Sequence, residues 1–418
     1  MLERDPAAAR KWTAVPAIPR GMGRSYGDSA LAPVVLDMTP NDRLLSFDPG
    51  TGELVCEAGL TLDAIARLFL PRGWFLPVTP GTRFVTVGGA VASDVHGKNH
   101  HVDGSFSDHL SWLKLLLADG SVVTCSPETD RELFLATTGG MGLTGVVLEA
   151  ALRLRPVESP WMVQRVRRLP DLDSVMAAFE ASAEATYSVA WIDCLKRGSS
   201  LGRSVFITGE HAGVEAAAGL GVPREPKRKN VPFFLPGRAL NPWSVRAFNA
   251  LYYGRAPEDS HGLVPLDPFF YPLDTVAHWN RIYGRRGFVQ YQFVIPRAGA
   301  HEGLAVILDA IAASGQGSFL AVLKLFGPGH GGYLSFPMEG WTLALDFPAT
   351  PRVLCLLKRL DSMVMEQGGR LYLTKDARMG PAMLEAGYPQ LAQFRAVKRR
   401  VDPDGRWASL QSRRLGLT

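Results

Sequence analysis

Apolar and polar positions alternate in short runs through the first 155 residues, which predicts a domain built largely from short strands. A helix is expected over residues 62–70, where apolar residues recur at helical spacing and Thr61 or Asp63 can cap the first turn. Residues 110–117 and 122–124 flank a turn and predict a hairpin. Further strands are expected at residues 34–38, 53–58 and 142–154, and helical turns at 6–13 and 131–136.

The pattern changes near residues 156–160, where we place a domain boundary. Beyond it, strands that alternate with longer amphipathic helices predict a sheet covered by helices. The expected strands are 188–193, 204–208, 288–295, 319–326 and 342–347, and the expected helices are 172–185, 300–313 and 352–367. The last segment is helical and basic. We therefore expect three parts, which are residues 1–155, 156–378 and 379–418.

Two glycine-rich segments, Pro19–Asp28 and Pro80–His101, interrupt this pattern. The second holds too much glycine for a helix, so we predict an irregular segment whose glycines allow close approach or positive φ. Backbone N–H groups freed in such segments form a nest for a phosphate. Two such segments about sixty residues apart suggest one ligand with a central pyrophosphate, although ordinary turns explain the first segment equally well on its own. A nicotinamide fingerprint fits poorly, because polar residues rather than a helix follow the first segment.

Length and composition permit two full hydrophobic cores, since the chain has 418 residues, 46% of them hydrophobic and 20% charged. No apolar run of about 18 residues and no apolar leader is present, so we expect neither a spanning helix nor a signal peptide. Cys56, Cys125, Cys194 and Cys355 lack metal or redox spacing, which predicts buried thiols in a reducing compartment. The net charge of +5 permits contact with phosphate or an anionic membrane. We expect a cytoplasmic or peripheral membrane protein without a nucleic-acid partner.

The glycine-rich segments carry a family resemblance. Residues 20–28 read R-G-M-G-R-S-Y-G-D, and residues 94–101 read D-V-H-G-K-N-H-H. These motifs resemble those of FAD-dependent oxidases with the vanillyl-alcohol-oxidase fold, and most of all the decaprenylphosphoryl-β-D-ribose 2'-oxidase family. The resemblance extends through residues 139–145, 279–281, 290–293, 319–327 and 372–376. It implies an α+β, two-domain PCMH-type FAD-binding fold with a sheet-and-helix substrate domain, and a first domain that is short at its N-terminus.

The resemblance also implies which residues hold the FAD. The expected contacts are Arg20, Gly21, Met22, Gly23, Arg24, Ser25, Tyr26, Gly81, Thr86, Val87, Gly88, Gly89, His96, Gly97, Lys98, Asn99, Val147 and Tyr372. Several relatives bind the flavin covalently through a histidine at or next to the position of Arg24, so we expect a non-covalent FAD here. His96 is expected beside the isoalloxazine ring as a catalytic residue, and a structural histidine is the alternative.

Two lysines, Lys375 and Lys324, are expected to take part in the reaction or in substrate binding. Lys375 resembles the family lysine beside the flavin and the substrate hydroxyl, where it supplies positive charge or acts as a base if burial lowers its pKa. A solvated lysine at a strand end is the alternative. Lys324 stands in an apolar run and must face a cavity or pair with an acid, and the resemblance implies that it holds the donor phosphate. The expected substrate contacts are Lys324, Gln292, Arg281, Trp279 and Lys375, and no metal is expected.

The resemblance implies oxidation of the 2'-hydroxyl of a polyprenyl-phosphoryl ribofuranose to the ketone, the first half of an epimerisation to the arabinofuranose donor. An NAD(P)H-dependent short-chain reductase would be the partner enzyme. The chain departs from the family in carrying Ala344 in place of a cysteine and Thr342 in place of a frequent asparagine. An aldonolactone or alditol oxidase is the alternative, but residues 374–376 read T-K-D rather than the H-W-x-K motif of those enzymes. A flavin-binding docking subunit is a third, weaker interpretation.

Residues 223–236 are basic, then aromatic, and broken by prolines, which predicts a mobile loop. With the residues up to 243, the segment offers cations followed by apolar side chains, a composition typical of contact with lipid headgroups. These residues are Arg224, Lys227, Arg228, Lys229, Phe233, Phe234, Leu235 and Trp243. A membrane contact and a solvated linker fit this pattern equally well.

Overall fold

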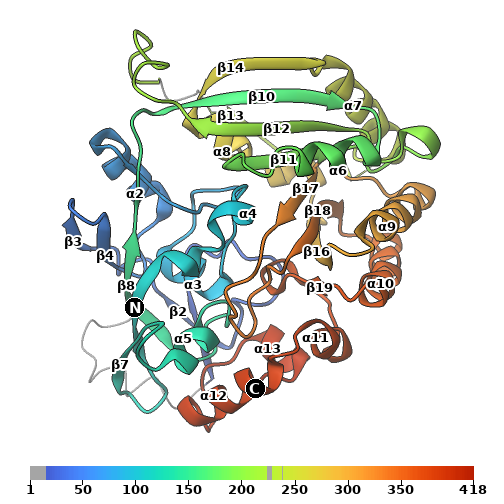
Figure 1. Ribbon diagram of the computed structural model, residues 1–418. Helices are drawn as coiled ribbons and strands as arrows, with labels where there is room; N and C mark the ends of the chain where they lie inside the picture. The colour runs from blue at the N-terminus through green and yellow to red at the C-terminus, as the bar shows by residue number, and fades with distance from the viewer. Residues whose placement is uncertain (1–15, 224–227, 238) are drawn as a thin grey trace.

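The structure is a computed structural model that describes residues 16–223, 228–237 and 239–418. Two β-sheets organise the chain, and helices pack against both of them (Figure 1). This mixture of antiparallel sheets and helices confirms the α+β class. The helical turn expected at residues 6–13 lies outside the described residues.

The smaller sheet has five strands in the order β3-β4-β8-β6-β7, and each neighbouring pair is antiparallel. The strands are β3 (Leu44–Asp48), β4 (Glu53–Glu57), β6 (Leu110–Leu116), β7 (Val122–Cys125) and β8 (Val146–Arg153). The expected hairpin is the β6–β7 pair. Helix α2 (Leu62–Phe69) begins after Thr61, whose hydroxyl accepts a hydrogen bond from the Ala64 N–H at 3.1 Å, as expected. Strand β1 (Ala17–Arg20) pairs in parallel with β2 (Val34–Asp37) and leads into the first glycine-rich segment.

The larger sheet has eight strands in the order β14-β10-β12-β11-β17-β18-β16-β19, again with antiparallel neighbours. Its strands are β10 (Trp161–Leu169), β11 (Tyr187–Ile192), β12 (Ser204–His211), β14 (Asp259–Pro265), β16 (Phe288–Pro296), β17 (Ala321–Phe326), β18 (Gly340–Pro348) and β19 (Arg370–Leu371). The sequence pattern predicted the strands near residues 188, 204, 288, 321 and 342 but not β10 or β14. Strand β14 is the edge strand and β10 is next to it, and both carry many polar residues, so they lack a clear apolar alternation.

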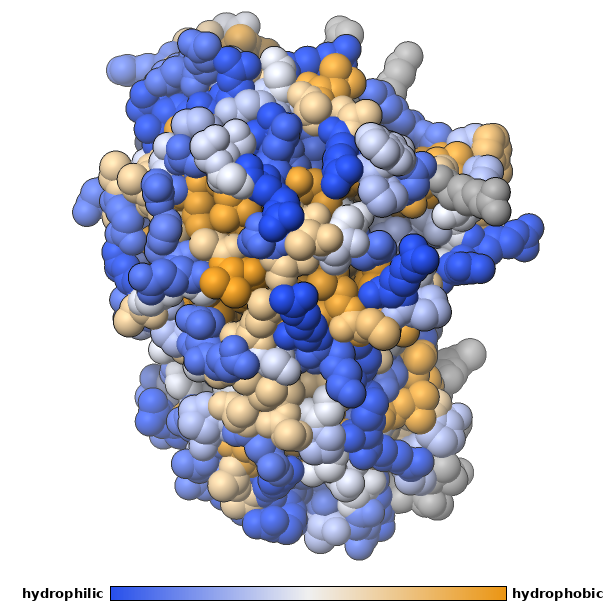
Figure 2. All heavy atoms as spheres, turned by 90° about the vertical axis from the view of Figure 1, so that its right-hand side faces the viewer, coloured by the Kyte–Doolittle hydropathy of each residue, from blue (hydrophilic) through white to orange (hydrophobic). Residues whose placement is uncertain are grey.

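Helices α6 (Leu172–Glu180), α9 (Ala300–Ser314) and α10 (Pro351–Glu366) cover one face of this sheet, and α9 and α10 form the right-hand side of Figure 1. Helix α10 starts with Pro351 in its first turn and a cap from Thr350. The buried strand residues on the covered side include Phe293, Leu323 and Leu343, each 0% exposed. Figure 2 faces the right-hand side of Figure 1 and shows hydrophilic and hydrophobic surface interspersed.

Glycine does not prevent a helix in the second glycine-rich segment, so that part of the sequence prediction was wrong. Helix α3 (Val87–Ser93) begins at Thr86, whose hydroxyl accepts from the Gly89 N–H at 3.1 Å. A Cβ on Gly88 would lie 3.0 Å from the Cβ of Ala58, so glycine lets α3 pack closely against the end of β4. The cap and this packing outweigh the low helix propensity of glycine. None of the four glycines in the segment has positive φ, whereas Gly23 and Gly27 in the first segment do.

Trp243 lies in a helix that follows the predicted loop, rather than in the loop itself. Helix α7 (Pro242–Arg255) is capped by Asn241, which accepts from the N–H groups of Trp243 and Ser244. An asparagine followed by proline is a helix-start signal that the sequence analysis missed. The preceding segment pairs β13 (Lys229–Asn230) with β15 (Val276–Ala277). Arg224 and Lys227 lie outside the described residues.

The remaining short elements connect these layers. They are β5 (Trp74–Phe75), β9 (Arg155–Pro156), α4 (His100–Asp103), α5 (Arg131–Thr137), α8 (Leu266–Phe270), α11 (Pro381–Gly387), α12 (Leu391–Val401) and α13 (Leu410–Leu415). The C-terminal helices lie at the bottom of Figure 1, where Arg400 of α12 binds Asp130 before α5 at 2.9 Å. Cys355 faces solvent on the outer side of α10, so the prediction that all four thiols are buried was wrong for this one. Among the described residues no helix is long and apolar enough to cross a membrane.

Candidate active site

The open face of the larger sheet is polar at its centre. Strand register places Lys324 of β17 opposite Thr342 of β18, and Gln292 of β16 opposite Ala344 of β18. Because side chains alternate along a strand, these residues share the face that the helices leave uncovered. Asp346 of β18 lies on the same face. A polar strip in the middle of an otherwise apolar sheet marks the candidate site.

His96 from the first domain meets this strip. The Gln292 side-chain nitrogen donates to His96 Nε2 at 3.0 Å, so the proton of the neutral ring lies on Nδ1. Burial first, and then the charge of Lys324, hold the pKa of His96 well below its usual value. Its Nδ1 is buried and has no hydrogen-bond partner among the described residues. The ring is packed between Phe326 and Tyr372, with centroids 4.8 and 5.2 Å away.

Lys375 ends the short helix η7 (Leu373–Lys375) and reaches the same place from the C-terminal side. Its ammonium lies 4.2 Å from the ring centroid of Tyr26, within cation–π distance. Burial lowers the pKa of Lys375 to about 8, opposed by the charge of Asp346 and assisted by that of Lys324. Lys375 therefore carries its positive charge below about pH 8.

Lys324 and Asp346 are the other charged groups of the strip. Lys324 Nζ lies 3.4 Å from the Gly97 carbonyl oxygen, and burial lowers the pKa of Lys324 to about 8. Burial raises the pKa of Asp346 to about 7, against a hydrogen bond from Gln290 and the charge of Lys375. Burial thus shifts the pKa of three ionisable groups toward neutrality in one place, which is typical of catalytic sites.

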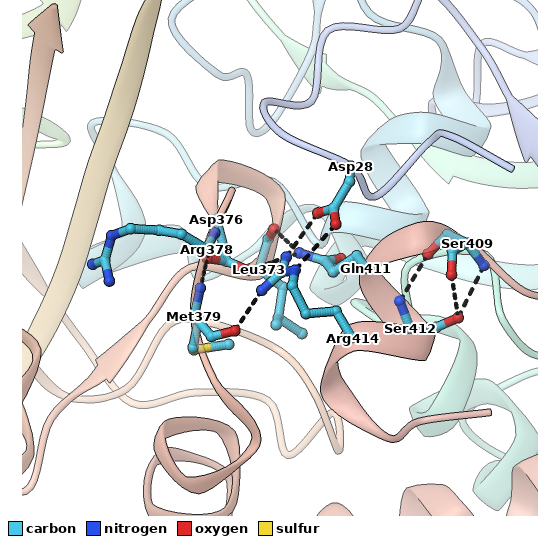
Figure 3. A network of polar contacts seen from close by, with 9 residues as sticks. All are labelled: Asp28, Leu373, Asp376, Arg378, Met379, Ser409, Gln411, Ser412 and Arg414. Atoms are coloured by element: carbon cyan, nitrogen blue, oxygen red, sulfur yellow. Dashed lines mark hydrogen bonds and ion pairs between the residues drawn. The ribbon is translucent and has the colours of Figure 1, made fainter. Parts of the chain in front are cut away.

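A polar network holds residues 373 and 376, which flank Lys375 (Figure 3). Arg414 of α13 donates to both carboxylate oxygens of Asp28, at 3.1 and 2.7 Å, and to Asp376 at 2.8 Å. Gln411 donates to the backbone carbonyl of residue 373 at 2.7 Å. The network therefore ties the turn that carries Lys375 to the first glycine-rich segment and to the C-terminal helix.

The two glycine-rich segments touch each other beside this site. A Cβ on Gly21 would lie 2.0 Å from Thr86 Oγ1, so only glycine permits the contact. Arg24 Nε donates to the Phe84 carbonyl at 3.3 Å. Gly81 is exposed, and a Cβ there would meet nothing within 4 Å, so the second segment borders open space. The two segments therefore lie side by side, which a single ligand in contact with both requires.

Three of the residues expected at the site have side chains that bind backbone carbonyls outside the polar strip. The Lys98 ammonium donates to the Phe269 carbonyl and lies over the Phe269 ring. The Asn99 amide binds the Pro77 carbonyl at 2.8 Å. Arg281 donates to backbone carbonyls at residues 231 and 232 and does not reach the polar strip.

Trp279 packs on Phe288 with ring centroids 5.1 Å apart. Tyr372 is closer to the strip, and its hydroxyl donates to the Ser93 carbonyl at 2.8 Å. Val87 and Val147 are buried, whereas Met22 is 37% exposed. The roles predicted for these residues stay predictions.

Sequence reasoning missed Asp346 and Tyr283. Asp346 was assigned to a strand without a chemical role, although an acid in the apolar run 342–347 carries the same signal that drew attention to Lys324. Tyr283, in the short helix η6 (Trp279–Tyr283), has a buried hydroxyl without a partner among the described residues. No pattern in the sequence distinguishes it from an ordinary core tyrosine.

Comparison with known proteins defines the class of protein. Residues 7–126 match the family described as FAD binding domain. The residues at the site fit this cofactor, because a buried imidazole N–H without a partner among the described residues and an open surface over two touching glycine-rich segments suit a ligand with hydrogen-bond acceptors. The fold and the site together define an FAD-binding oxidoreductase.

Relatives over nearly the whole length narrow this further. The chain is 39% identical over 411 residues, 96% of its length and 89% of the relative, to decaprenylphosphoryl-β-D-ribose oxidase of Mycolicibacterium smegmatis. It is 39% identical over 373 residues, 86% of its length and all of the relative, to an uncharacterised protein of Streptomyces coelicolor. Human Δ(24)-sterol reductase is 30% identical over 120 residues, 29% of this chain and 23% of that enzyme. The chain belongs to the decaprenylphosphoryl-β-D-ribose oxidase family.

Proposed function

We propose that this protein is an FAD-dependent oxidoreductase that oxidises the 2'-hydroxyl of a polyprenyl-phosphoryl-β-D-ribofuranose to the 2'-keto sugar. The observation that carries the proposal is the meeting of His96, Gln292, Lys324 and Lys375 on one polar strip, in a chain 39% identical over 96% of its length to a decaprenylphosphoryl-β-D-ribose oxidase. The product would be the substrate of a reductase that completes the epimerisation.

The residues of the strip have distinct tasks in this proposal. FAD, when bound, supplies the two-electron oxidant of the reaction. Residues 20–26, residues 81–89 and His96 would hold it, with the His96 Nδ1 proton directed at an acceptor of the cofactor. Lys375 places a fixed positive charge where negative charge develops. Lys324 attracts the phosphate of the substrate, and Gln292 holds the neutral tautomer of His96 through its 3.0 Å hydrogen bond.

Substrate discrimination tests the proposal against the lactone-oxidase alternative. That alternative has some support, because the chain is 27% identical over 140 residues to a putative D-arabinono-1,4-lactone oxidase of Neurospora crassa. The measurement is anaerobic bleaching of the flavin absorbance by farnesylphosphoryl ribose, compared with L-gulono- and D-arabinono-lactones. We expect bleaching by the phosphoryl ribose alone. Bleaching by the lactones alone would establish the alternative.

The cofactor is proposed to be non-covalent, because Arg24 rather than histidine stands at the attachment position and its guanidinium binds a backbone carbonyl. Acid or heat should release intact FAD into the supernatant of the precipitated protein. Flavin that stays with the denatured chain would contradict this.

We also propose peripheral contact with an anionic membrane through residues 228–243. Phe233, Phe234 and Trp243 are 63%, 46% and 77% exposed, and Lys229 is exposed beside them. Each basic residue near an anionic surface contributes about 1 kcal/mol of binding. A nicotinamide-dependent short-chain reductase is the proposed partner enzyme, since the keto sugar must be reduced to complete the epimerisation.

A further inference from the structure

Asp346 is a buried carboxylate beside the residues to which the proposed function assigns tasks. It is 1% exposed and lies in β18 on the same face as Lys324 and Gln292. Gln290 donates to its Oδ1 at 2.5 Å. Its Oδ2 is buried and has no hydrogen-bond partner among the described residues. A buried carboxylate oxygen without a donor is unfavourable, so the site is complete only when a ligand brings one.

The groups around Asp346 point to the same place. The titratable groups that face it are Lys375 from η7, Tyr26 from the first glycine-rich segment and Tyr283 from η6. Burial raises the pKa of both tyrosines, and the negative charge of Asp346 raises them further. The Tyr283 hydroxyl is likewise buried without a partner in the described part of the chain. Two unpartnered polar atoms beside one cation form a place for a hydroxyl-bearing ligand.

We propose that Asp346 is a catalytic residue whose Oδ2 accepts the proton of the substrate hydroxyl, while Lys375 beside it stays a fixed positive charge. This assignment rests on the proposed function. The hydroxyl O–H bond breaks and its proton passes to the carboxylate. The C–H bond on the same carbon would break, its hydrogen leaving with the bonding pair to the two-electron oxidant that FAD supplies when bound, and the O–H electron pair would form the C=O bond. The carboxyl then releases its proton to solvent.

The two groups are suited to this division of tasks near neutral pH. Burial raises the pKa of Asp346 to about 7 and lowers that of Lys375 to about 8. A carboxylate that accepts a proton near neutral pH can therefore stand beside an ammonium that keeps its charge. A base with a pKa near the working pH is the most effective one.

The substitution Asp346→Asn tests the proposal with little structural change. An asparagine side chain at this position would keep the oxygen that accepts from Gln290 and replace only the unpartnered Oδ2. We expect FAD to stay bound and kcat for farnesylphosphoryl ribose to fall by about 10²- to 10⁴-fold, the usual contribution of a general base. The fall of kcat/KM below about pH 7 should disappear with it. This fall at low pH is the acid limb of the pH profile. If Asp346 acted only by keeping Lys375 charged, the profile would have no acid limb, because Lys375 stays protonated when Asp346 takes up a proton.

A titration that does not depend on turnover accompanies the kinetics. Carboxyl infrared difference spectra of the FAD-loaded protein should show one group titrating near pH 7 in the wild type, absent in Asp346→Asn. Asp361→Asn is the matched control, since Asp361 of α10 is also a largely buried carboxylate but pairs with Arg378 away from the strip. That control should keep the titrating group and the acid limb.

The outcomes separate the two proposals. If Asp346→Asn turns over at the wild-type rate, or keeps the acid limb, or if no carboxyl titrates near pH 7, Asp346 is not the base. If the wild type is not bleached by farnesylphosphoryl ribose at any pH, the proposed function itself fails, and this role for Asp346 with it.

Discussion

Replacing His330 by glutamine should weaken the fold and remove a specific part of its pH dependence. His330 lies in the loop between β17 and β18 and donates from Nε2 to Asp94 Oδ2 at 2.8 Å. Asp94 ends α3, is 0% exposed, and also accepts from Ser107 and Ser335. The pair therefore fastens a loop of the larger sheet to the helix beside the candidate FAD site. Residue 336 of this loop packs on the ring of His96.

The stability that the His330–Asp94 pair contributes can be worked out from the pKa of the Asp94 carboxylate. Burial alone would raise the pKa of Asp94, but the charge of His330 and the hydrogen bonds outweigh it and hold the pKa at about 2, against 3.8 in a peptide. At about 1.4 kcal/mol per pKa unit, the difference corresponds to about 2–3 kcal/mol of stability. This stability is present above pH 3.8 and is lost as the pH falls toward 2. Removing one partner of a buried pair costs about 3–5 kcal/mol, and glutamine, which can still donate, should lie near the lower end.

The stability that His330 contributes depends on pH in the opposite sense to that of Asp94. Burial lowers its pKa, but Asp94 outweighs burial and holds the pKa above 6.5. Its contribution is therefore complete below pH 6.5 and is lost as the pH rises through the raised value. Urea unfolding from about pH 5 to about pH 9 should show His330→Gln to be less stable than the wild type at low pH, by a difference that shrinks as the pH rises through the raised pKa of His330. Parallel curves, or equal stability at low pH, would refute the reasoning.

Three further expectations concern the site and the surface. Lys324→Ala should raise KM with kcat nearly unchanged, because a residue that only grips the phosphate binds ground and transition states alike, and steady-state kinetics with farnesylphosphoryl ribose measures this. Arg414→Ala should lower kcat, because it releases the turn that carries Lys375. Arg414→Lys should restore kcat only in part, because lysine cannot bind Asp28 through two nitrogens. A kcat restored in full by lysine would show that the positive charge alone is enough. Binding to anionic liposomes should be weak, salt-sensitive and lost when the basic residues become serine, with activity on a water-soluble substrate unchanged. Those residues are Arg224, Lys227, Arg228 and Lys229.

Much of the secondary structure could be predicted from periodicity, and the failures have identifiable causes. Strands β17 and β18 are mostly apolar runs, and α10 has a clear apolar stripe, so each is visible in the sequence. Helix α3 was missed because glycine content was weighed without the Thr86 cap and the contact with Ala58. Tertiary contacts override propensity in such short helices.

The candidate site could be predicted only where a motif marks it. His96 and Lys375 lie in recognisable motifs, whereas Asp346 becomes significant only when the register of β16 and β18 places it beside Gln290. The turn network of Arg414 joins residues 28, 376 and 414, and no sequence pattern connects positions so far apart. The direction of a side chain such as Lys98 is also beyond a motif, because it depends on the carbonyl that it finds in the fold.

The register of β18 links the fold to the chemistry. Thr342, Ala344 and Asp346 face the open side, while Leu343, Leu345 and Phe347, each 0% exposed, pack beneath the helices. A slip of one residue would exchange the two sets, place the carboxylate among leucines beneath the helices and put three large apolar side chains in the polar strip. The hydrophobic core therefore selects the register, and the same selection delivers Asp346 to the polar strip. Because the strip depends on the core in this way, substitutions that loosen β18 from α9 and α10 should disturb catalysis before they unfold the protein.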